Sequence, residues 1–124
     1  MQDTDDGSTE AQKAISYAEN LATQLRKGYL AYCVLLATQT PRYTSDILRL
    51  LADAQMVAVE GTMYPLLSRL QKDGLLQHEW QESEQGPPRK YYSVTEYGRL
   101  VAKELDDQIT ALDKTLKKLK KGEK

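Results

Sequence analysis

Hydrophobic residues in the first third of the chain predict two helices. Positions recurring at intervals of three and four indicate an amphipathic helix that starts near Ser8 or Thr9 and carries a narrow stripe. The stripe consists of Ala11, Ala14, Ala18, Leu21 and Leu25. Gly28 is expected to interrupt this helix. Residues 29–38 are apolar nearly all round and predict a buried second helix that ends before Pro41.

Two shorter helices are predicted in the middle of the chain. Thr44 or Ser45 is expected to cap a helix over residues 46–54. The next helix should cover residues 60–73 and end at Gly74, because glycine readily takes the left-handed conformation found at helix C-termini. Pro65 is placed in its first turn or so, where a missing N–H costs little.

The helix over residues 60–73 is expected to have one buried and one outer face. A helical period places four apolar residues on the buried stripe, namely Met63, Leu66, Leu67 and Leu70. The outer face should then carry Thr62, Tyr64, Ser68, Arg69 and Lys72.

A hairpin and a long helix are predicted in the last part of the chain. Residues 75–82 and 89–94 are strand-like runs around a Gly-Pro-Pro-containing turn at residues 83–88. Alternation puts Tyr91 and Tyr92 on opposite faces, one in the core and one partly exposed. A final helix should start at Thr95 and carry apolar residues at heptad spacing, which predicts a seam for a second helix. The seam consists of Ala102, Leu105, Ile109, Leu112, Leu116 and Leu119.

Length and composition narrow the class of protein. With 124 residues the chain is about one domain long. We expect a leader over residues 1–9 that is disordered, a main domain over 10–94 and a dimerisation helix over 95–124. There is no apolar run of the roughly 18 residues that span a bilayer, and the N-terminus is acidic, so a cytoplasmic protein with no membrane partner is expected.

Charge and reactive residues exclude other functions. The net charge of −1 gives no general attraction to nucleic acid, although six lysines lie between residues 114 and 124. We interpret these lysines as a solvated helix end rather than as a specific DNA-binding element. A solvated end of this kind can still raise non-specific affinity for DNA. Cys33 and His78 offer neither a metal site nor a nucleophile with its base and orienting partner. We therefore expect that the protein binds no metal or cofactor and is not an enzyme. Cys33 is interpreted as a small core residue and His78 as a surface strand residue. Trp80 is interpreted as a residue that packs in the core or in the wing rather than as a platform for a ligand.

The order of these elements predicts a mainly α fold with a small β-hairpin, namely a winged helix-turn-helix with an N-terminal helix and a long C-terminal dimerisation helix. In that geometry the helix over residues 60–73 enters the major groove, and the tip of the hairpin reaches the adjacent groove or the DNA backbone. The candidate DNA-binding residues are Thr44, Ser45, Thr62, Tyr64, Ser68, Arg69, Lys72, Arg89 and Lys90. The alternative is a winged-helix module for protein association without a DNA target.

Two motifs resemble the PadR family of transcriptional regulators. The first is Gly-Thr-Met-Tyr-Pro-Leu-Leu at residues 61–67, and the second is Gly-Pro-Pro-Arg-Lys-Tyr-Tyr at residues 86–92. The resemblance covers about residues 24–119 and is closest to the smaller subgroup with a single C-terminal helix. It implies bacterial repression of a nearby gene, often relieved by a small aromatic or drug-like effector. The order of recognition helix, wing and heptad helix itself predicts a homodimer that binds a pseudo-palindromic site. The helix before Gly28, including Leu21 and Leu25, lies mostly outside the pattern and is expected to pack on the last helix of a partner subunit.

Two positions depart from the family pattern. Val59 stands where a capping serine is common and cannot accept a hydrogen bond from the helix, at a cost of about 1 kcal/mol. Thr44 and Ser45 stand where the family often has Gly-Tyr, so hydroxyls replace an aromatic contact. DNA specificity is expected to differ accordingly.

Overall fold

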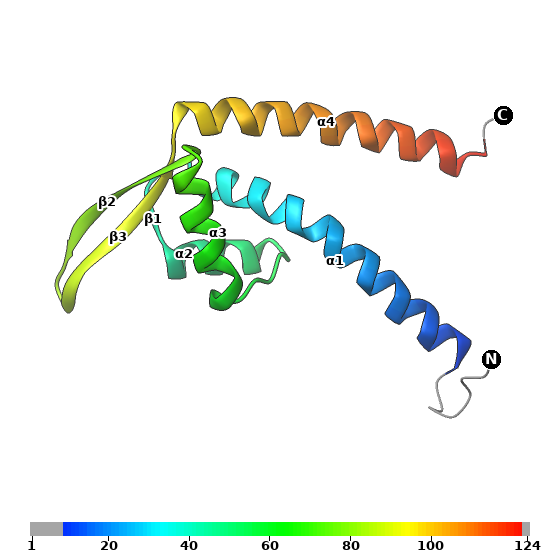
Figure 1. The fold of residues 1–124 in the computed structure, drawn as a ribbon, viewed down its shortest axis with the longest axis horizontal. Helices are drawn as coiled ribbons and strands as arrows, with labels where there is room; N and C mark the ends of the chain where they lie inside the picture. Colours follow the sequence, from blue (N-terminus) through cyan, green and yellow to red (C-terminus); the bar gives the residue numbers. More distant parts are fainter. Residues whose placement is uncertain (1–8, 123–124) are drawn as a thin grey trace. The chain divides into compact units, whose positions relative to one another are not determined.

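Four helices and a small sheet make up residues 9–122. The computed structural model describes residues 9–122, which fall into two compact units, residues up to 30 and residues from 31 onward. The helices are α1 (Glu10–Ala37), α2 (Thr44–Asp53), α3 (Glu60–Lys72) and α4 (Glu96–Lys120) (Figure 1). The strands β1 (Arg42–Tyr43), β2 (Leu76–Ser83) and β3 (Gly86–Val94) form an antiparallel sheet in the order β1-β3-β2. This mainly helical fold with a hairpin confirms the predicted winged-helix architecture.

The first helix is longer than predicted. Thr9 and Gln12 form a reciprocal cap: the Thr9 hydroxyl accepts from the Gln12 N–H at 3.1 Å, and the Gln12 side chain accepts from the Thr9 N–H at 2.8 Å. The expected start near Thr9 is therefore confirmed, while residues 1–8 of the predicted leader lie outside the described residues. The interruption at Gly28 is wrong, because α1 continues through it to Ala37. A glycine inside a helix costs only about 1 kcal/mol, which the surrounding turns offset.

The start of α2 also differs from the prediction. The helix begins at Thr44, and Tyr43 rather than Thr44 or Ser45 is its N-cap residue. The Tyr43 backbone N–H donates to the Asp46 carboxylate at 3.3 Å, so the cap uses the main chain of Tyr43 and not its ring. Tyr43 also belongs to β1, a strand that the sequence pattern did not predict because two residues are too few to show alternation.

The predicted faces of α3 are confirmed. Met63, Leu67 and Leu70 are buried and Leu66 is half-buried. The helix ends as expected, since Gly74 has the left-handed φ of +86°. The placement of Pro65 is wrong, because it is the sixth residue of α3 and lies beyond the first turn. Its missing N–H removes the intrahelical bond to the Gly61 carbonyl.

The hairpin turn is tighter than predicted. Ser83 pairs with Gly86, so the turn residues are 84 and 85, and the expected Gly-Pro-Pro loop lies within β3. Because Gln81 pairs with Arg89, Glu82 stands opposite both Pro87 and Pro88 in a β-bulge. A bulge interrupts the ladder and so tolerates residues that have no N–H.

The core of residues 31–122 joins all of these elements. Its fully buried side chains include Val34, Leu35, Ile47, Met63, Leu67 and Val94. Tyr92 is buried and Tyr91 half-buried, which confirms the predicted alternation in β3. None of the helices in residues 9–122 combines the length and hydropathy that crossing a bilayer requires.

Thr95 begins α4, as predicted. Its hydroxyl accepts from the Gly98 N–H at 2.9 Å and donates to the Gly74 carbonyl at 2.7 Å. Gly98 is buried against the hairpin: a Cβ there would collide with the Leu75 carbonyl oxygen and lie 2.6 Å from Val94 Cγ2. The start of α4 is thus fixed to the sheet by a cap and by a close backbone approach that only glycine permits.

Candidate nucleic-acid interface

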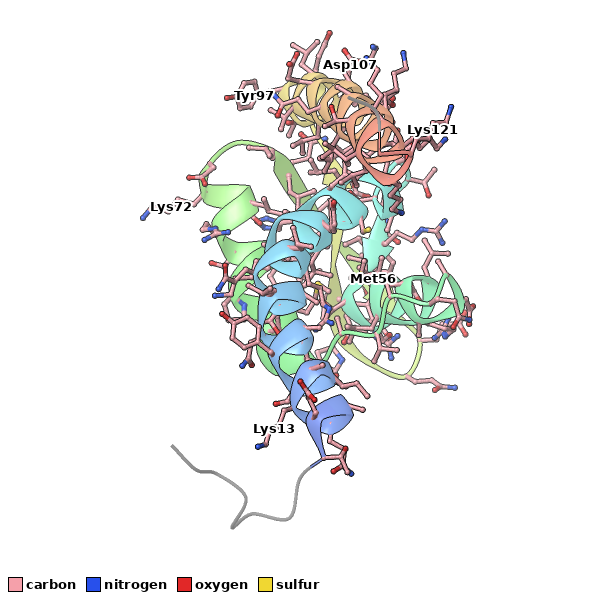
Figure 2. All side chains as sticks on the ribbon, turned by 90° about the vertical axis from the view of Figure 1, so that its right-hand side faces the viewer. Lys13, Met56, Lys72, Tyr97, Asp107 and Lys121 are labelled. Carbon is pink, nitrogen blue, oxygen red and sulfur yellow. The ribbon has the colours of Figure 1, made fainter. Side chains whose placement is uncertain are left out.

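The outer face of α3 presents the side chains that the sequence placed there. Tyr64 is 50% exposed, and the other four residues are exposed as well: Thr62, Ser68, Arg69 and Lys72. Figure 2 shows the Lys72 side chain extending away from the ribbon at the end of α3. The face arises because the apolar stripe of Met63, Leu67 and Leu70 turns the opposite side of the helix outward. These five side chains supply hydroxyls, an aromatic ring and two cations.

The N-terminus of α3 has no side-chain cap. Val59 is its N-cap residue and makes no side-chain hydrogen bond, as the departure from the family pattern predicted. Its carbonyl accepts from the N–H groups of Thr62 and Met63, each at 3.0 Å. The N–H groups of Glu60 and Gly61 precede the first intrahelical bond and therefore remain open to an outside acceptor.

A shallow groove of about 370 Å³ joins α3 to the hairpin. Tyr64 lines it from α3, while Arg89 and Lys90 line it from β3. The hairpin projects beyond α2 and α3 (Figure 1), so its outer part is free to border such a groove. Four predicted site residues from segments far apart in sequence therefore line one concave surface, namely Thr44, Tyr64, Arg89 and Lys90.

Trp80 belongs to this surface although the sequence did not suggest it. It is 64% exposed and lines the groove, so it does not pack in the core, one of the two packing roles predicted for it. Its ring meets that of His78 edge-on, with centroids 6.1 Å apart. Strand alternation from Leu76 places Trp80 on the core-facing side of β2. It is exposed because the core ends before the hairpin does, and no signal in the sequence marks that point.

The two predicted site residues at the start of α2 differ from each other in exposure. Thr44 is only 4% exposed, although it also lines the groove, and its contact with DNA stays a prediction. It is buried because α2 begins at this residue, one turn before Ile47 on the same face. Ser45 is exposed but does not line the groove.

The two cations of the wing are held over aromatic rings. Arg89 Cζ lies 4.7 Å from the centroid of the Tyr43 ring, and Lys90 Nζ lies 5.4 Å from that of Tyr92. Within residues 9–122 neither Arg89 nor Lys90 forms an ion pair. Their charges are therefore available to an anionic partner.

The remaining reactive side chains have structural surroundings. His78 Nδ1 lies 3.0 Å from Gln71 Oε1, a bond between β2 and α3. Cys33 is half-buried, less than a core residue would be, and burial raises the pKa of its thiol, which keeps it protonated at neutral pH. No group of His, Cys, Asp and Glu side chains in residues 9–122 could hold a metal ion.

The heptad seam of α4 is covered only near its start. Ala102 is buried, Leu105 and Ile109 are half-buried, and the rest of the seam is exposed: Leu112, Leu116 and Leu119. Leu21 and Leu25 of α1 are also exposed, at 53% and 59%.

An exposed polar helix beside a two-stranded hairpin, both carried on a small helical unit, defines a winged helix-turn-helix protein, a class that binds duplex DNA. Comparison with known families gives a more specific assignment. The chain belongs to the PadR-like family of transcriptional regulators, whose model matches residues 34–104. It is accordingly a DNA-binding transcriptional regulator and not an enzyme, as the sequence indicated.

Solved structures of PadR-type regulators resemble the chain over most of its length. A PadR-like transcription factor from Bacteroides fragilis is 48% identical, with 81% of this chain and 98% of that one covered and a TM-score of 0.69. A PadR family regulator from Eggerthella lenta is 33% identical, with 86% and 95% covered and a TM-score of 0.78. One from Bacillus cereus is 32% identical, with 81% and 99% covered and a TM-score of 0.69. No curated protein matched the chain.

Proposed function

We propose that two copies of this chain bind a pseudo-palindromic duplex, each placing α3 in the major groove and its hairpin against the neighbouring backbone. The observation that carries the proposal is the groove that unites Tyr64 of α3 with Arg89 and Lys90 of the hairpin. A duplex offers bases and phosphates at this spacing to a helix and an adjoining wing.

The side chains of α3 divide into two roles. Thr62, Tyr64 and Ser68 have hydroxyls that can donate to or accept from base edges in the major groove. Arg69 and Lys72 lie in the last turn and are exposed, so they suit contacts to phosphate that fix the register of the helix. Ser45 at the start of α2 is a further candidate for the backbone.

Dimerisation rests on the exposed seam of α4. Leucines at heptad spacing that remain uncovered in one chain favour pairing with a second helix. The exposed Leu21 and Leu25 of α1 supply a further apolar surface for the partner. Two recognition helices related by a two-fold axis would read half-sites about one helical turn, or roughly 34 Å, apart.

The regulator is proposed to act as a repressor that a small aromatic or drug-like molecule releases. The family resemblance supports this, as does an open groove of about 370 Å³ between the end of α1 and the start of α4. Tyr32, Leu36 and Ala102 are among its lining residues. Thermal shift measurements with phenolic and planar cationic compounds test the proposal. Stabilisation by a compound that also releases DNA supports it, and no stabilisation across the panel contradicts it.

The direct test of DNA recognition is a band-shift assay on fragments from upstream of the chain's own gene. Tyr64→Ala and Arg89→Ala should each weaken binding at least about fivefold, since contacts of this kind are each worth about 1–3 kcal/mol. Tyr97→Ala is the matched control, because Tyr97 is 57% exposed on α4 and does not line the groove. Binding by both groove variants as tight as wild type would overturn the proposal. Absence of any retained duplex at low salt would instead favour a protein-association module.

A further inference from the structure

Three side chains form a stack on the outer face of the sheet. Tyr43 of β1 pairs with Tyr91 of β3, and their ring centroids lie 5.9 Å apart. Arg89 is two residues before Tyr91 and so projects from the same face of β3. Its guanidinium carbon lies 4.7 Å from the Tyr43 ring centroid. The stack therefore runs from Tyr91 through Tyr43 to Arg89.

The ring of Tyr43 is not required by the secondary structure around it. The cap of α2 uses the backbone N–H of Tyr43, and pairing with β3 uses its main chain as well. Tyr43 is half-buried and also lines the groove between α3 and the hairpin. Its aromatic side chain is thus free for a role that a smaller apolar residue at the same position would not fill.

Stacking would change what Arg89 can do. An exposed arginine samples many rotamers, and binding a phosphate costs the loss of that freedom. A guanidinium that lies over a ring is already restricted, while its N–H groups stay available at the edge for a bidentate contact. Since Arg89 has no ion-pair partner in residues 9–122, the aromatic ring is the contact that orients it.

We propose that Tyr43 is a positioning residue for DNA binding, which holds the Arg89 guanidinium in the orientation that contacts a backbone phosphate. The inference rests on the proposed function, because it assumes that Arg89 meets DNA. It adds a residue that touches no DNA in this account and acts only through Arg89.

The first measurement needs no DNA. In the free protein, the ring current of Tyr43 should shift the Arg89 side-chain proton resonances upfield in a carbon–proton correlation spectrum. Tyr43→Phe keeps the ring and should keep the shift, whereas Tyr43→Leu should abolish it. Tyr97→Leu is the control and should leave Arg89 unchanged. Arg89 resonances that are the same in wild type and in folded Tyr43→Leu would overturn the proposal.

The second measurement is duplex affinity at several salt concentrations. Arg89→Ala should lower the slope of log affinity against log salt by about 0.9, the value for one lost phosphate contact. Tyr43→Leu should weaken binding by roughly threefold to tenfold, in line with cation–π energies, while Tyr43→Phe binds as wild type. In the double variant Tyr43→Leu/Arg89→Ala, affinity should equal that of Arg89→Ala alone, because Tyr43 has nothing left to position.

The outcomes separate the two proposals. If wild type retains no duplex, the proposed function fails, and the spectra still report whether the stack exists. If Arg89→Ala weakens binding and Tyr43→Leu does not, only the positioning role of Tyr43 is wrong. Additive losses in the double variant would also overturn that role, since Tyr43 would then act independently of Arg89. Thermal melting of each variant checks that it is folded, and Tyr43→Met, which also lacks the ring, provides the test if Tyr43→Leu is not.

Discussion

The two halves of α4 differ in the contacts that they make with the rest of the chain. At its start the helix is capped by Thr95, closely packed at Gly98 and buried at Ala102. Tyr32 of α1 donates to Asp106 at 3.1 Å and joins the same region. From residue 110 to residue 122 every side chain is exposed, including the leucines of the seam. The first half belongs to the fold of one chain, whereas the second half has an apolar stripe that the chain itself does not cover.

Because of this difference, substitutions in the two halves of α4 should affect the stability of the chain and its dimerisation separately. Isolated helices in water gain little from propensity and depend on the packing of an apolar face. The exposed pair of Lys117 and Asp113, 3.0 Å apart, adds only a few tenths of a kcal/mol. Substitutions in the first half should therefore lower the stability of the chain, and substitutions in the second half should lower its tendency to dimerise.

The largest effect is expected at Gly98. Gly98→Ala places a methyl group against the Leu75 carbonyl and should cost about 3 kcal/mol or more, because backbone atoms must move apart. The matched control is Gly28→Ala, where a Cβ meets nothing within 4 Å and the helix should gain about 0.5–1 kcal/mol. Urea unfolding at one fixed protein concentration measures both. Equal stability of the two variants would contradict the close packing at the start of α4.

The seam should govern dimerisation. Leu112→Lys/Leu116→Lys removes two leucines that are each 42% exposed in the single chain and should weaken the dimer by about 30-fold, or ~2 kcal/mol. Sedimentation velocity over a concentration series measures the change. The control Lys114→Gln/Lys118→Gln alters charge on the same helix and should leave the dimer intact. A dimer unaffected by the leucine substitutions would place the interface elsewhere.

The cap of α4 should have a smaller effect. Thr95→Ala removes the acceptor for the Gly98 N–H and the donor to the Gly74 carbonyl, and should cost about 1 kcal/mol. Thr95→Ser keeps the hydroxyl and should recover most of this loss. Urea unfolding is the measurement, and no difference between alanine and serine at this position would exclude the cap as a source of stability.

The smallest effect is expected at Tyr32. Tyr32→Phe removes the hydrogen bond to Asp106 and should cost about 0.5 kcal/mol at neutral pH, because the pair is partly exposed. Burial, assisted by Asp106, raises the pKa of Tyr32. The stability it adds is therefore complete below its ordinary pKa near 10 and is lost as pH rises through the raised pKa. Wild type should lose stability relative to Tyr32→Phe above about pH 10, and parallel pH profiles would contradict this.

Periodicity predicted the helices and their faces, whereas local context decided the rest. Met63, Leu67 and Leu70 sit on the buried side of α3 because a helical period leaves few alternatives. Gly28 was expected to end a helix because local propensity disfavours glycine, yet a single glycine costs less than the flanking turns supply. The strand β1 could not be seen in two residues, since its existence depends on pairing with β3.

The candidate site was predicted only in part, because periodicity places residues on a face but does not show which faces meet. Tyr64, Arg89 and Lys90 were expected from the outer face of a helix and from the hairpin, and they line one groove. Trp80 was missed because alternation cannot show where the hairpin leaves the core. Thr44 lines the same groove but is buried, because α2 begins two residues earlier than predicted. The contact between Arg89 and Tyr43 depends on β1, so it could not be predicted from the sequence either.

The central claim is that α3 and the hairpin together bind duplex DNA through specific and phosphate contacts. It is tested most directly by titrating the upstream duplex with wild-type protein at several salt concentrations and determining how many chains bind. The account predicts two chains per duplex and a log affinity that falls linearly with log salt, with a slope that reflects several phosphates. An unbound duplex at low salt, or an affinity independent of salt, would contradict it.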